Sequence, residues 1–317
     1  MKRACFLWCL SLFLSASVAT LLPGHAAAAA YPERTITMII PFGAGGATDV
    51  IGRYIALHLG KRLGQTIIVK NIAGSGGVIG MTELAGARPD GYTIGFSPIA
   101  PLIMQPNFRK TMYNLSSFCS IARATNEPLF LEVSPQSSIK DMAGLKKAVQ
   151  AAPNKFFWGH LGVGSQIHLS MAHMFKLMGV NPKGIVFKDD TEAMAALISG
   201  RIMLYDSLPS LPERYGVRAI AALSAERYPQ LNVPTALEQG YDLRYTQWLS
   251  LVGPKDMPAD RIAVLERAFA EVCKDPDYIK DIASVHSVPA YLNSKDNAAF
   301  MLEEEAYYKR VMKEILK

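Results

Sequence analysis

The chain has 317 residues, half of them hydrophobic, and a formal net charge of +6. That length allows one large domain or two lobes of ordinary size. The positive charges are spread along the chain without a basic block, which disfavours nucleic acid as a partner and leaves a mild bias toward anionic ligands. After residue 30, no run approaches the roughly 18 apolar residues that a membrane-spanning helix needs.

Residues 1–30 have the pattern of a secretory signal peptide. Two basic residues precede an apolar stretch that ends at Leu22, and a tract of alanines follows. A positive n-region, an apolar h-region and small residues at the cleavage site are the features of such a signal. We expect cleavage near Ala28–Ala30, a mature chain that begins near Tyr31, and a periplasmic location. A retained membrane anchor is the alternative.

The first part of the mature chain alternates predicted strands and helices. Alternating apolar residues indicate strands, and apolar residues every three or four positions indicate helices. This order is typical of a parallel sheet with right-handed crossovers. The predicted elements are a strand at 35–40, a helix that ends before Gly64, a strand at 66–69, a short helix through 83–87 and a strand at 92–96.

The same alternation then restarts, and the last part of the chain is expected to return to the first unit. The predicted strands are 129–133, 156–158, 184–187, 202–205, 219–223 and 249–252, and the predicted helices cover 142–149, 167–177, 191–199, 259–274 and 297–316.

Two such series predict an α/β protein of two lobes, each a mainly parallel sheet flanked by helices. Residues 1–30 are assigned to the signal, 31–128 with 247–317 to lobe 1, and 129–246 to lobe 2. A ligand would lie between the lobes, at the C-terminal edges of the strands.

Two glycine-rich loops stand where a predicted strand passes into a predicted helix. The first is Pro41–Asp49 and the second is Gly74–Gly80. Such a loop brings free backbone N–H groups and the positive end of a helix dipole to one place, which favours an anion. A tight turn would explain one of these loops. Two loops in successive units favour an anionic ligand such as a carboxylate.

The loops do not match the motifs of nucleotide-binding proteins. Ile79 occupies the third glycine position of a dinucleotide fingerprint, and neither loop ends in the Gly-Lys-Ser/Thr of a P-loop. No ligand pattern for a metal is present, so we expect neither a metal nor a cofactor. Cys119 and Cys273 remain in the mature chain, and the sequence allows either one disulfide or two free thiols.

A third small-residue loop, Gly162–Ser165, precedes the predicted helix that carries His168. A hydrolase or lyase could use Ser165 and His168, but Val163 and Ile167 stand where a nucleophile elbow requires glycine. Ser165 is better placed to cap the helix and donate to a ligand. His168 is either a core histidine bonded to the backbone or a donor in a pocket. Asp206 follows a predicted strand and could accept from a ligand amine or hydroxyl.

Several motifs together resemble the periplasmic receptors of tripartite tricarboxylate transporters, the Bug or TctC family. The resemblance covers nearly all of the mature chain. The motifs are Tyr31-Pro, Pro41-Phe-x-x-Gly-Gly-x-x-Asp49, Gly76-Gly-x-x-Gly80, Pro89-Asp-Gly-Tyr-Thr93, Gly162-x-Gly-Ser-x-x-His168, Leu197-x-x-Gly200, Val233-Pro-Thr235 and Glu238-x-Gly240.

The resemblance implies a Venus-flytrap fold that closes on a small carboxylic acid, without catalysis or a cofactor. The family binds di- and tricarboxylates, some amino acids and some aromatic acids, and delivers them to the membrane components of a transporter. The first two glycine loops would hold one ligand carboxylate, partly through ordered water. The loop Gly162–His168 would help to set specificity.

Four departures from the family pattern concern the loops. His160 replaces a usual serine, Met203 stands where an aspartate is common, Gly43-Ala44 replaces Pro-Pro, and Phe187-Lys188-Asp189 replaces Tyr-Lys-Gly. The identity of the ligand is therefore left open by the sequence.

The leading hypothesis is an exported, monomeric receptor that captures a small organic carboxylate and delivers it to a membrane transporter. A periplasmic hydrolase or lyase and a carboxylate sensor for a signalling partner are the alternatives. The residues expected to bind the ligand are Phe42, Ala44, Gly45, Gly46, Thr48, Asp49, Ser75, Gly76, Gly77, Ser97, Gly164, Ser165, His168 and Asp206.

Overall fold

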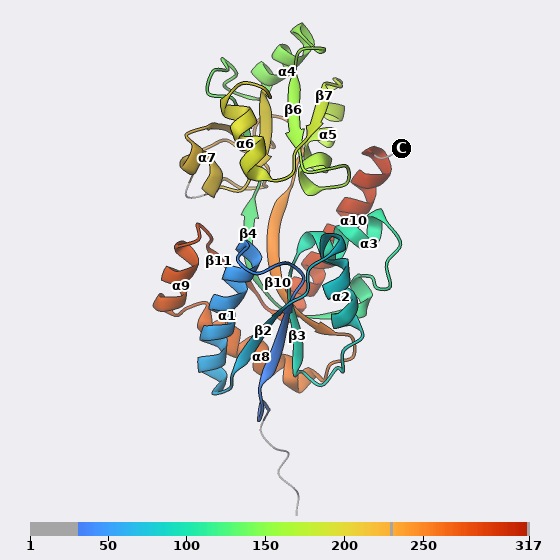
Figure 1. Ribbon diagram of the computed structural model, residues 1–317, viewed down its shortest axis with the longest axis vertical. Coiled ribbons are helices and arrows are strands. Elements are labelled where there is room, and N and C mark those ends of the chain that lie inside the picture. The colour runs from blue at the N-terminus through green and yellow to red at the C-terminus, as the bar shows by residue number, and fades with distance from the viewer. Residues whose placement is uncertain (1–30, 229–230, 316–317) are drawn as a thin grey trace, which may run out of the picture.

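The computed structural model describes residues 31–228 and 231–315, which form two lobes around two separate sheets (Figure 1). The expected signal peptide, residues 1–30, lies outside the described residues. The first sheet has six strands and the second has five. We call the parts built on them lobe 1 and lobe 2.

The sheet of lobe 1 has the strand order β11-β4-β10-β3-β1-β2. Strand β1 pairs in parallel with both β2 and β3, whereas β10 is antiparallel to β3 and β4, and β11 is antiparallel to β4. The strands are β1 (Ile36–Ile40), β2 (Ile67–Asn71), β3 (Thr93–Pro98), β4 (Phe118–Pro128), β10 (Thr246–Pro254) and β11 (Pro289–Leu292).

The sheet of lobe 2 has the order β7-β6-β8-β5-β9. Strand β6 is parallel to β7 and β8, and β5 is antiparallel to β8 and β9. Both sheets are therefore mixed, with the expected parallel pairing confined to part of each. The strands are β5 (Phe130–Val133), β6 (Phe157–His160), β7 (Lys183–Val186), β8 (Leu204–Ser207) and β9 (Arg218–Ala222).

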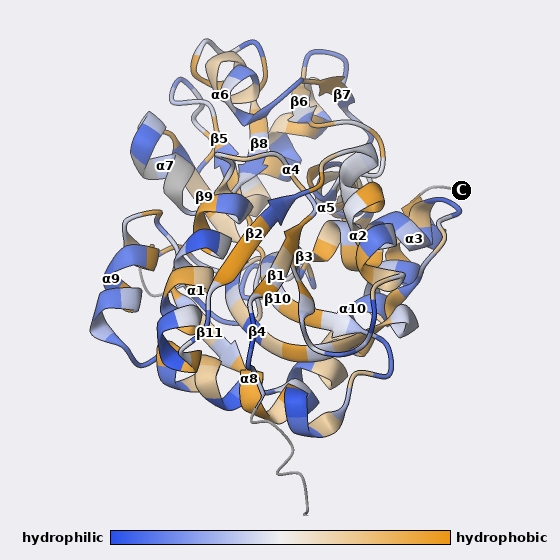
Figure 2. Cartoon of the chain, turned by 60° about the horizontal axis from the view of Figure 1, so that its bottom comes forward, coloured by the Kyte–Doolittle hydropathy of each residue, from blue (hydrophilic) through white to orange (hydrophobic). Residues whose placement is uncertain are grey.

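Helices cover both faces of the sheets, and their apolar sides supply the core. Figure 2 shows apolar strands at the centre and helices of mixed polarity around them. The helices are α1 (Ala47–Leu63), α2 (Val78–Ala85), α3 (Gln105–Phe108), α4 (Met142–Ala151), α5 (Gln166–Met178), α6 (Asp190–Ile198), α7 (Ser210–Tyr215), α8 (Ala259–Val272), α9 (Pro276–Ala283) and α10 (Ser294–Ile315), with short helical turns η1 (Ser75–Gly77), η2 (Ala100–Met104) and η3 (Leu115–Ser117).

One face of the lobe 1 sheet packs against α1, α8 and α9. Ile51, Ile55 and Leu59 recur along α1 at helical spacing and join Leu265 and Phe269 of α8 in one buried cluster. The helix α1 ends where Gly64 adopts a left-handed conformation with φ of 65°, as the sequence predicted. Fixing α1 against the sheet also fixes the loop that precedes it.

The lobes are joined by long strands that the sequence pattern did not reveal in full. Strand β4 spans 11 residues and continues directly into β5 of lobe 2, and β10 returns beside β4 (Figure 1). The predicted elements included no strand at β4, because its polar residues, among them Ser120, Thr125 and Glu127, are buried between neighbouring strands rather than exposed.

The C-terminal helix α10 also reaches lobe 2. It packs against α5, where the Gln166 side chain donates to the Tyr308 hydroxyl at 3.2 Å and Lys176 donates to the Glu314 carbonyl at 2.8 Å. Within residues 31–228 and 231–315, no helix is both long enough and apolar enough to cross a bilayer.

Candidate ligand-binding site

A cavity of about 680 Å³ lies between the lobes, and we call it the interlobe cavity. Lobe 1 contributes the first glycine loop and the start of α1, and lobe 2 contributes the starts of α5 and α6. Its lining residues are Phe42, Gly43, Ala44, Gly46, Ala47, Thr48, Pro98, Ile99, Ala100, Leu129, Leu161, Ser165, Gln166, Ile167, Asp190, Ser207, Leu208 and Gln247.

On the lobe 1 side, the wall is the uncapped N-terminus of α1. Gly46 is the residue before the helix, and no side chain caps the helix amides there. The first intrahelical bond runs from Val50 N to Gly46 O, so the N–H groups of residues 47–49 have no helical partner. Gly46, Ala47 and Thr48 line the cavity, which places these amides and the positive helix end against it.

Asp49 fixes this loop from behind and does not line the cavity. Its Oδ2 accepts from Gly45 N at 2.8 Å and from Arg53 Nε at 2.9 Å, and its Oδ1 accepts from Asn71 Nδ2 at 2.8 Å. Asn71 also donates to the Phe42 carbonyl at 3.0 Å. Burial acts to raise the pKa of Asp49, but these hydrogen bonds outweigh burial and hold the pKa below its usual value.

The second glycine loop packs within lobe 1 and contributes no lining residue. Arg109 donates to the Ser75 hydroxyl at 2.9 Å and to the Ser75 carbonyl at 2.7 Å. A Cβ on Gly77 would lie 2.7 Å from Pro101 Cβ. The glycines at 76 and 77 both have left-handed φ, so here they serve close packing of the turn.

Ser97 is fully buried on β3 and donates to the carbonyl of Pro98 at 3.1 Å. The cavity is lined instead by Pro98, at the carboxyl end of the same strand. Ser97 therefore stands one position behind the wall.

On the lobe 2 side, the wall is the start of α5. Ser165 caps this helix, because its hydroxyl accepts from His168 N at 3.2 Å. Residues 165–167 line the cavity and present the remaining free amides of the helix. The Gln166 side chain donates to the Thr246 carbonyl at 2.9 Å, which ties this helix start to strand β10.

Two polar side chains from lobe 2 complete the wall. Asp190 starts α6 and accepts from the Tyr205 hydroxyl at 2.6 Å, and burial raises its pKa. Ser207 donates to the carboxylate of Glu132, a buried residue behind the wall. The cavity therefore has an acidic side chain on its lobe 2 side, and in the described part of the chain no lysine or arginine lines it.

Asp206 is fully buried behind this wall and bonded to Ser170. Strand β8 ends at Ser207, two residues later than the sequence predicted. The later end places Asp206 within the strand, and Ser207 and Leu208 line the cavity instead. Burial raises the pKa of Asp206 well above its usual value.

His168 lies away from the interlobe cavity, and Ser165 and His168 do not form a nucleophile–base pair. The Ser165 hydroxyl bonds the backbone N–H of His168, not its ring. The ring Nδ1 accepts from Gly164 N, and the ring lies 4.9 Å from that of His160. Gly164 also does not line the cavity, and a Cβ added there would lie 2.7 Å from the Phe108 ring of lobe 1. The geometry of a serine hydrolase is therefore lacking at these residues.

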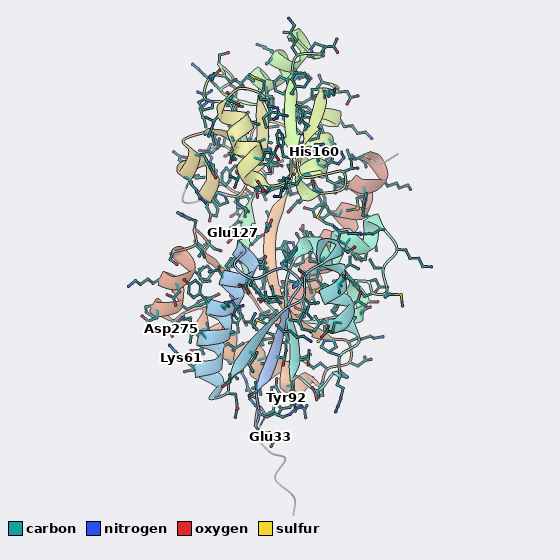
Figure 3. All side chains as sticks on the ribbon, viewed as in Figure 1. Glu33, Lys61, Tyr92, Glu127, His160 and Asp275 are labelled. Atoms are coloured by element: carbon teal, nitrogen blue, oxygen red, sulfur yellow. The ribbon has the colours of Figure 1, made fainter. Side chains whose placement is uncertain are left out.

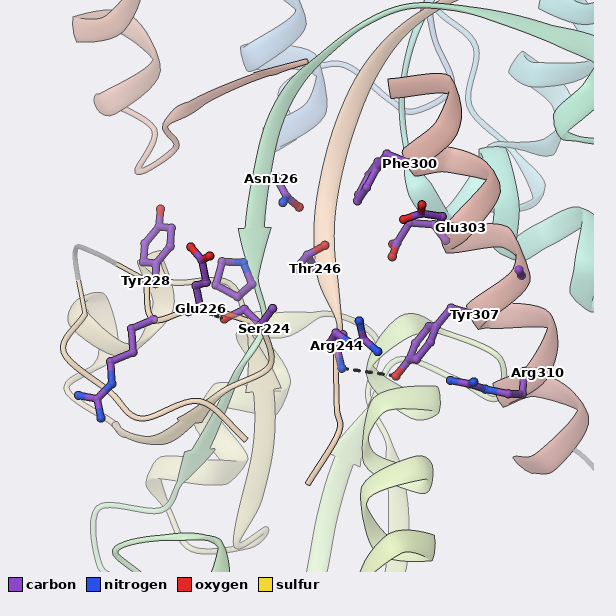
Figure 4. Close-up of a pocket in the computed structure, with 15 residues that line it drawn as sticks. Asn126, Ser224, Glu226, Tyr228, Arg244, Thr246, Phe300, Glu303, Tyr307 and Arg310 are labelled. Carbon is purple, nitrogen blue, oxygen red and sulfur yellow. Dashed lines mark hydrogen bonds between the residues drawn. The ribbon is translucent and has the colours of Figure 1, made fainter. Parts of the chain in front are cut away.

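A second cavity, the hinge pocket, lies on the other face of the strands that join the lobes (Figure 4). Thr246 lines it, whereas Gln247 lines the interlobe cavity, and neighbouring residues of a strand point to opposite faces. Its lining residues carry both signs of charge, including Arg244, Arg310 and Glu303. Figure 3 shows Glu127 on strand β4, where this strand passes from lobe 1 to lobe 2.

Five of the fourteen expected residues line the interlobe cavity. Three of them have polar or aromatic side chains, and the other two are small. The lining group comprises Phe42, Ala44, Gly46, Thr48 and Ser165, and the group that lies elsewhere comprises Gly45, Asp49, Ser75, Gly76, Gly77, Ser97, Gly164, His168 and Asp206.

The polar lining residues that were not among the expected site residues are Gln166, Asp190, Ser207 and Gln247. Gln247 could not be placed because strand β10 begins at Thr246, earlier than its apolar pattern. Among the described residues, no group of three or more His, Cys, Asp or Glu could hold a metal, and Cys119 and Cys273 are free thiols.

One family model matches this chain in the comparison with known proteins. The model of the tripartite tricarboxylate transporter family receptor matches residues 51–316. A UPF0065 protein encoded in the tcbD-tcbE intergenic region of Pseudomonas sp. strain P51 is 32% identical over 255 residues, covering 77% of this chain and 74% of that protein.

Two solved structures have the same fold over most of their length. A TctC solute-binding protein from Polaromonas, without ligand, has a TM-score of 0.81 and 28% identity, covering 90% of this chain and 99% of that chain. MatC from Rhodopseudomonas palustris, with bound malate, has a TM-score of 0.72 and 27% identity, covering 89% and 99%.

Proposed function

The chain belongs to the tripartite tricarboxylate transporter receptor family of solute-binding proteins, and on this premise we propose that it captures a small organic carboxylate in the interlobe cavity. It is a receptor, not an enzyme. The ligand would then be delivered to the membrane components of a tripartite transporter. Residues 31–128 with 247–317 form one closing lobe in this proposal and residues 129–246 the other, and the leader at 1–30 directs export to the periplasm.

The observation that carries the proposal is the meeting of two helix N-termini at one cavity. The start of α1 from lobe 1 and the start of α5 from lobe 2 both line it. Their free amides can donate to carboxylate oxygens, and both helix dipoles favour negative charge. Because the two starts belong to different lobes, a ligand that binds both favours the closed arrangement.

The lobe 2 end of the cavity limits which carboxylate fits. Asp190 lines it, and a second ionised carboxylate placed beside this side chain would be repelled. Ser207 and the α5 amides offer polar partners nearby. We infer that the ligand presents a hydroxyl, an amine or a protonated carboxyl group toward Asp190 and its ionised carboxylate toward the α1 start.

A thermal-shift screen tests the proposal. The purified protein is heated with acetate, malate, citrate, aspartate, benzoate and, as a neutral control, glucose. A ligand present at a hundred times its dissociation constant adds about 2.7 kcal/mol of stability, which raises the melting temperature measurably. Stabilisation by one or more carboxylates and none by glucose supports the proposal. Stabilisation by glucose alone would reject a carboxylate receptor.

A further inference from the structure

The lobe 2 loop that reaches the interlobe cavity rests on a pair of histidines. Leu161 and Ser165 line the cavity, and Gly162 and Gly164 lie between them. Behind the loop lie His160, at the end of β6, and His168, in the first turn of α5. We call His160 and His168 the histidine pair, and Figure 3 shows His160 in the part of lobe 2 that faces lobe 1.

Each histidine ring accepts a hydrogen bond from one backbone N–H group of the loop. Gly162 N donates to His160 Nδ1 at 3.1 Å, and Gly164 N donates to His168 Nδ1 in a longer bond of 3.4 Å. Both glycines have positive φ, 106° and 81°, which glycine adopts readily and other residues do not, so the loop depends on glycine at these two positions. The two bonds hold alternate residues of the loop.

Packing against neighbouring aromatic rings holds the histidines in place. The His160 and His168 rings lie 4.9 Å apart, and the Trp158 ring lies 4.9 Å from His160 and 6.0 Å from His168. Trp158 is itself anchored by a bond from its indole nitrogen to the Pro182 carbonyl at 3.0 Å. The side chains that support the loop are therefore fixed by packing.

We propose that His160 and His168 are positioning residues, which hold the ligand loop of lobe 2 in its binding conformation through their Nδ1 atoms. The proposal rests on the proposed function for its effect on binding. An Nδ1 atom that accepts an amide proton must carry no proton, so each ring is neutral with its proton on Nε2.

The surroundings do not favour a charged ring. Burial lowers the pKa of both histidines, that of His168 to about 4 with a further contribution from His160. The charged side chains that line the pocket around the pair are Lys176, which donates to the Glu314 carbonyl, and Glu314. On the other side of the loop, Asp190 lines the interlobe cavity.

Acid should therefore release the loop. Once Nδ1 is protonated, its N–H faces the N–H of Gly162 or Gly164, and the hydrogen bond is replaced by repulsion. The pKa values lie below the usual value, so the support is complete near neutral pH and is lost as the pH falls through the pKa of His168, about 4.

The first test needs no ligand. Imidazole ¹⁵N shifts and the exchange protection of the Gly162 and Gly164 amides are measured by NMR in the parent protein, His168→Asn and His168→Phe. Asparagine places Oδ1 near the position of Nδ1 and keeps a hydrogen-bond acceptor. Phenylalanine keeps an aromatic ring but has no acceptor. We expect the Nε2-protonated tautomer in the parent, and protection of Gly164 retained in His168→Asn and reduced about fivefold in His168→Phe at one pH.

The second test uses malate, or the carboxylate that gives the largest thermal shift, in calorimetric titrations at pH 7 and pH 4. The parent should bind more weakly at pH 4 than at pH 7, and His168→Phe should bind weakly at both pH values. His168→Asn should lose the part of the pH dependence that this ring causes. The NMR experiment, repeated with His160→Asn and His160→Phe, reports on the amide of Gly162.

The outcomes of the two tests are distinct. Equal Gly164 protection in all three proteins, or imidazole shifts that place the proton on Nδ1, would overturn the role of the histidine pair whatever the ligand. Correct tautomers and protection with no carboxylate binding would leave the positioning of the loop intact and reject the proposed function.

Discussion

The loops that meet at the interlobe cavity are supported in different ways. In lobe 1, the ionised Asp49 holds Gly45, Arg53 and Asn71. In lobe 2, two neutral histidine rings hold Gly162 and Gly164. Charge-assisted hydrogen bonds are stronger than neutral ones. The lobe 1 loop is therefore held by stronger hydrogen bonds than the lobe 2 loop, whose support, in our proposal, depends on protonation.

The helix starts beside these loops also differ. The α1 start has no side-chain cap, so its amides are free for a ligand, whereas Ser165 uses one amide of α5 as a cap. We infer that lobe 1 supplies most of the affinity for the carboxylate. Lobe 2, which contributes Asp190 and Ser207, then determines which carboxylate is accepted.

The largest effect is expected from crowding the lobe 1 site with Gly46→Val. The residue has an ordinary φ of −78°, and the nearest atom to an added Cβ is Gly43 O at 3.9 Å, so the fold should survive. The larger side chain would occupy the cavity, and we expect a loss of affinity of about a hundredfold. Calorimetric titration with the best carboxylate measures it.

The matched control is Gly46→Ala, whose methyl group should cost much less affinity. Circular dichroism and the melting temperature check that both variants are folded. If Gly46→Val binds as tightly as the parent, the carboxylate is not held by the α1 start.

The second effect concerns selectivity at lobe 2. Asp190→Asn keeps an acceptor for the Tyr205 hydroxyl and removes the negative charge from the cavity wall. We expect affinity for dicarboxylates to rise about tenfold relative to ligands that present an amine. Competition titrations with malate and aspartate give the ratio. An unchanged ratio would mean that Asp190 does not face the ligand.

Asp189→Asn is the control for Asp190→Asn. Asp189 does not line the cavity and accepts from Glu192 N as the cap of α6, and asparagine is an equally good cap. It should alter the net charge without altering selectivity.

A smaller effect is expected when the α5 cap is removed. Ser165→Ala leaves His168 N without its acceptor, which typically costs about 1 kcal/mol of stability. Affinity should fall about threefold to fivefold, because the amides at residues 166 and 167 lose their fixed orientation. Denaturant unfolding and calorimetry measure the two effects. Ser165→Thr should restore both, since threonine also caps helices, and failure of that rescue would point to a different role for the hydroxyl.

The smallest effect on binding is expected from Asp49→Asn, because Asp49 orients the loop and does not line the cavity. Affinity should fall about twofold to threefold, while stability at pH 7 falls by about 1–2 kcal/mol through the weakened bonds to Arg53 and Gly45.

The acid profile gives the sign of the Asp49 contribution. Its folded pKa lies below the unfolded value, so its stabilisation is present above pH 3.8 and is lost as the pH falls through the folded pKa. The stability difference between parent and Asp49→Asn, measured by denaturant unfolding, should therefore shrink below pH 3.8. A difference that grows in acid would contradict this role.

Most of the fold could be predicted from the sequence because its strands and helices carry clear apolar periodicity. The elements that were not predicted are α3, β4, α7, α9 and β11. Strand β4 was missed because its buried polar residues are bonded within the protein: Glu127 accepts from Ser287, and Asn297 donates to Ser120. Such partners come from distant parts of the chain and leave no local signal.

The site could be predicted in part for a similar reason. The first glycine loop and Ser165 were found because a strand, a loop and a helix follow one another in the sequence. The placement of His168 and Asp206 depended on which way a side chain points, and for Asp206 on where β8 ends. A shift of one position moves a strand residue to the other face of the sheet, so small errors in a boundary relocate a site residue.

We propose that backbone amides from both lobes hold a carboxylate in the interlobe cavity. A crystal structure with malate, or with the carboxylate that gives the largest thermal shift, tests it most directly. We expect carboxylate oxygens within hydrogen-bond distance of the amides of residues 47–49, with the other end of the ligand near residues 165–167. A ligand bound instead in the hinge pocket against Arg244 and Arg310 would contradict it.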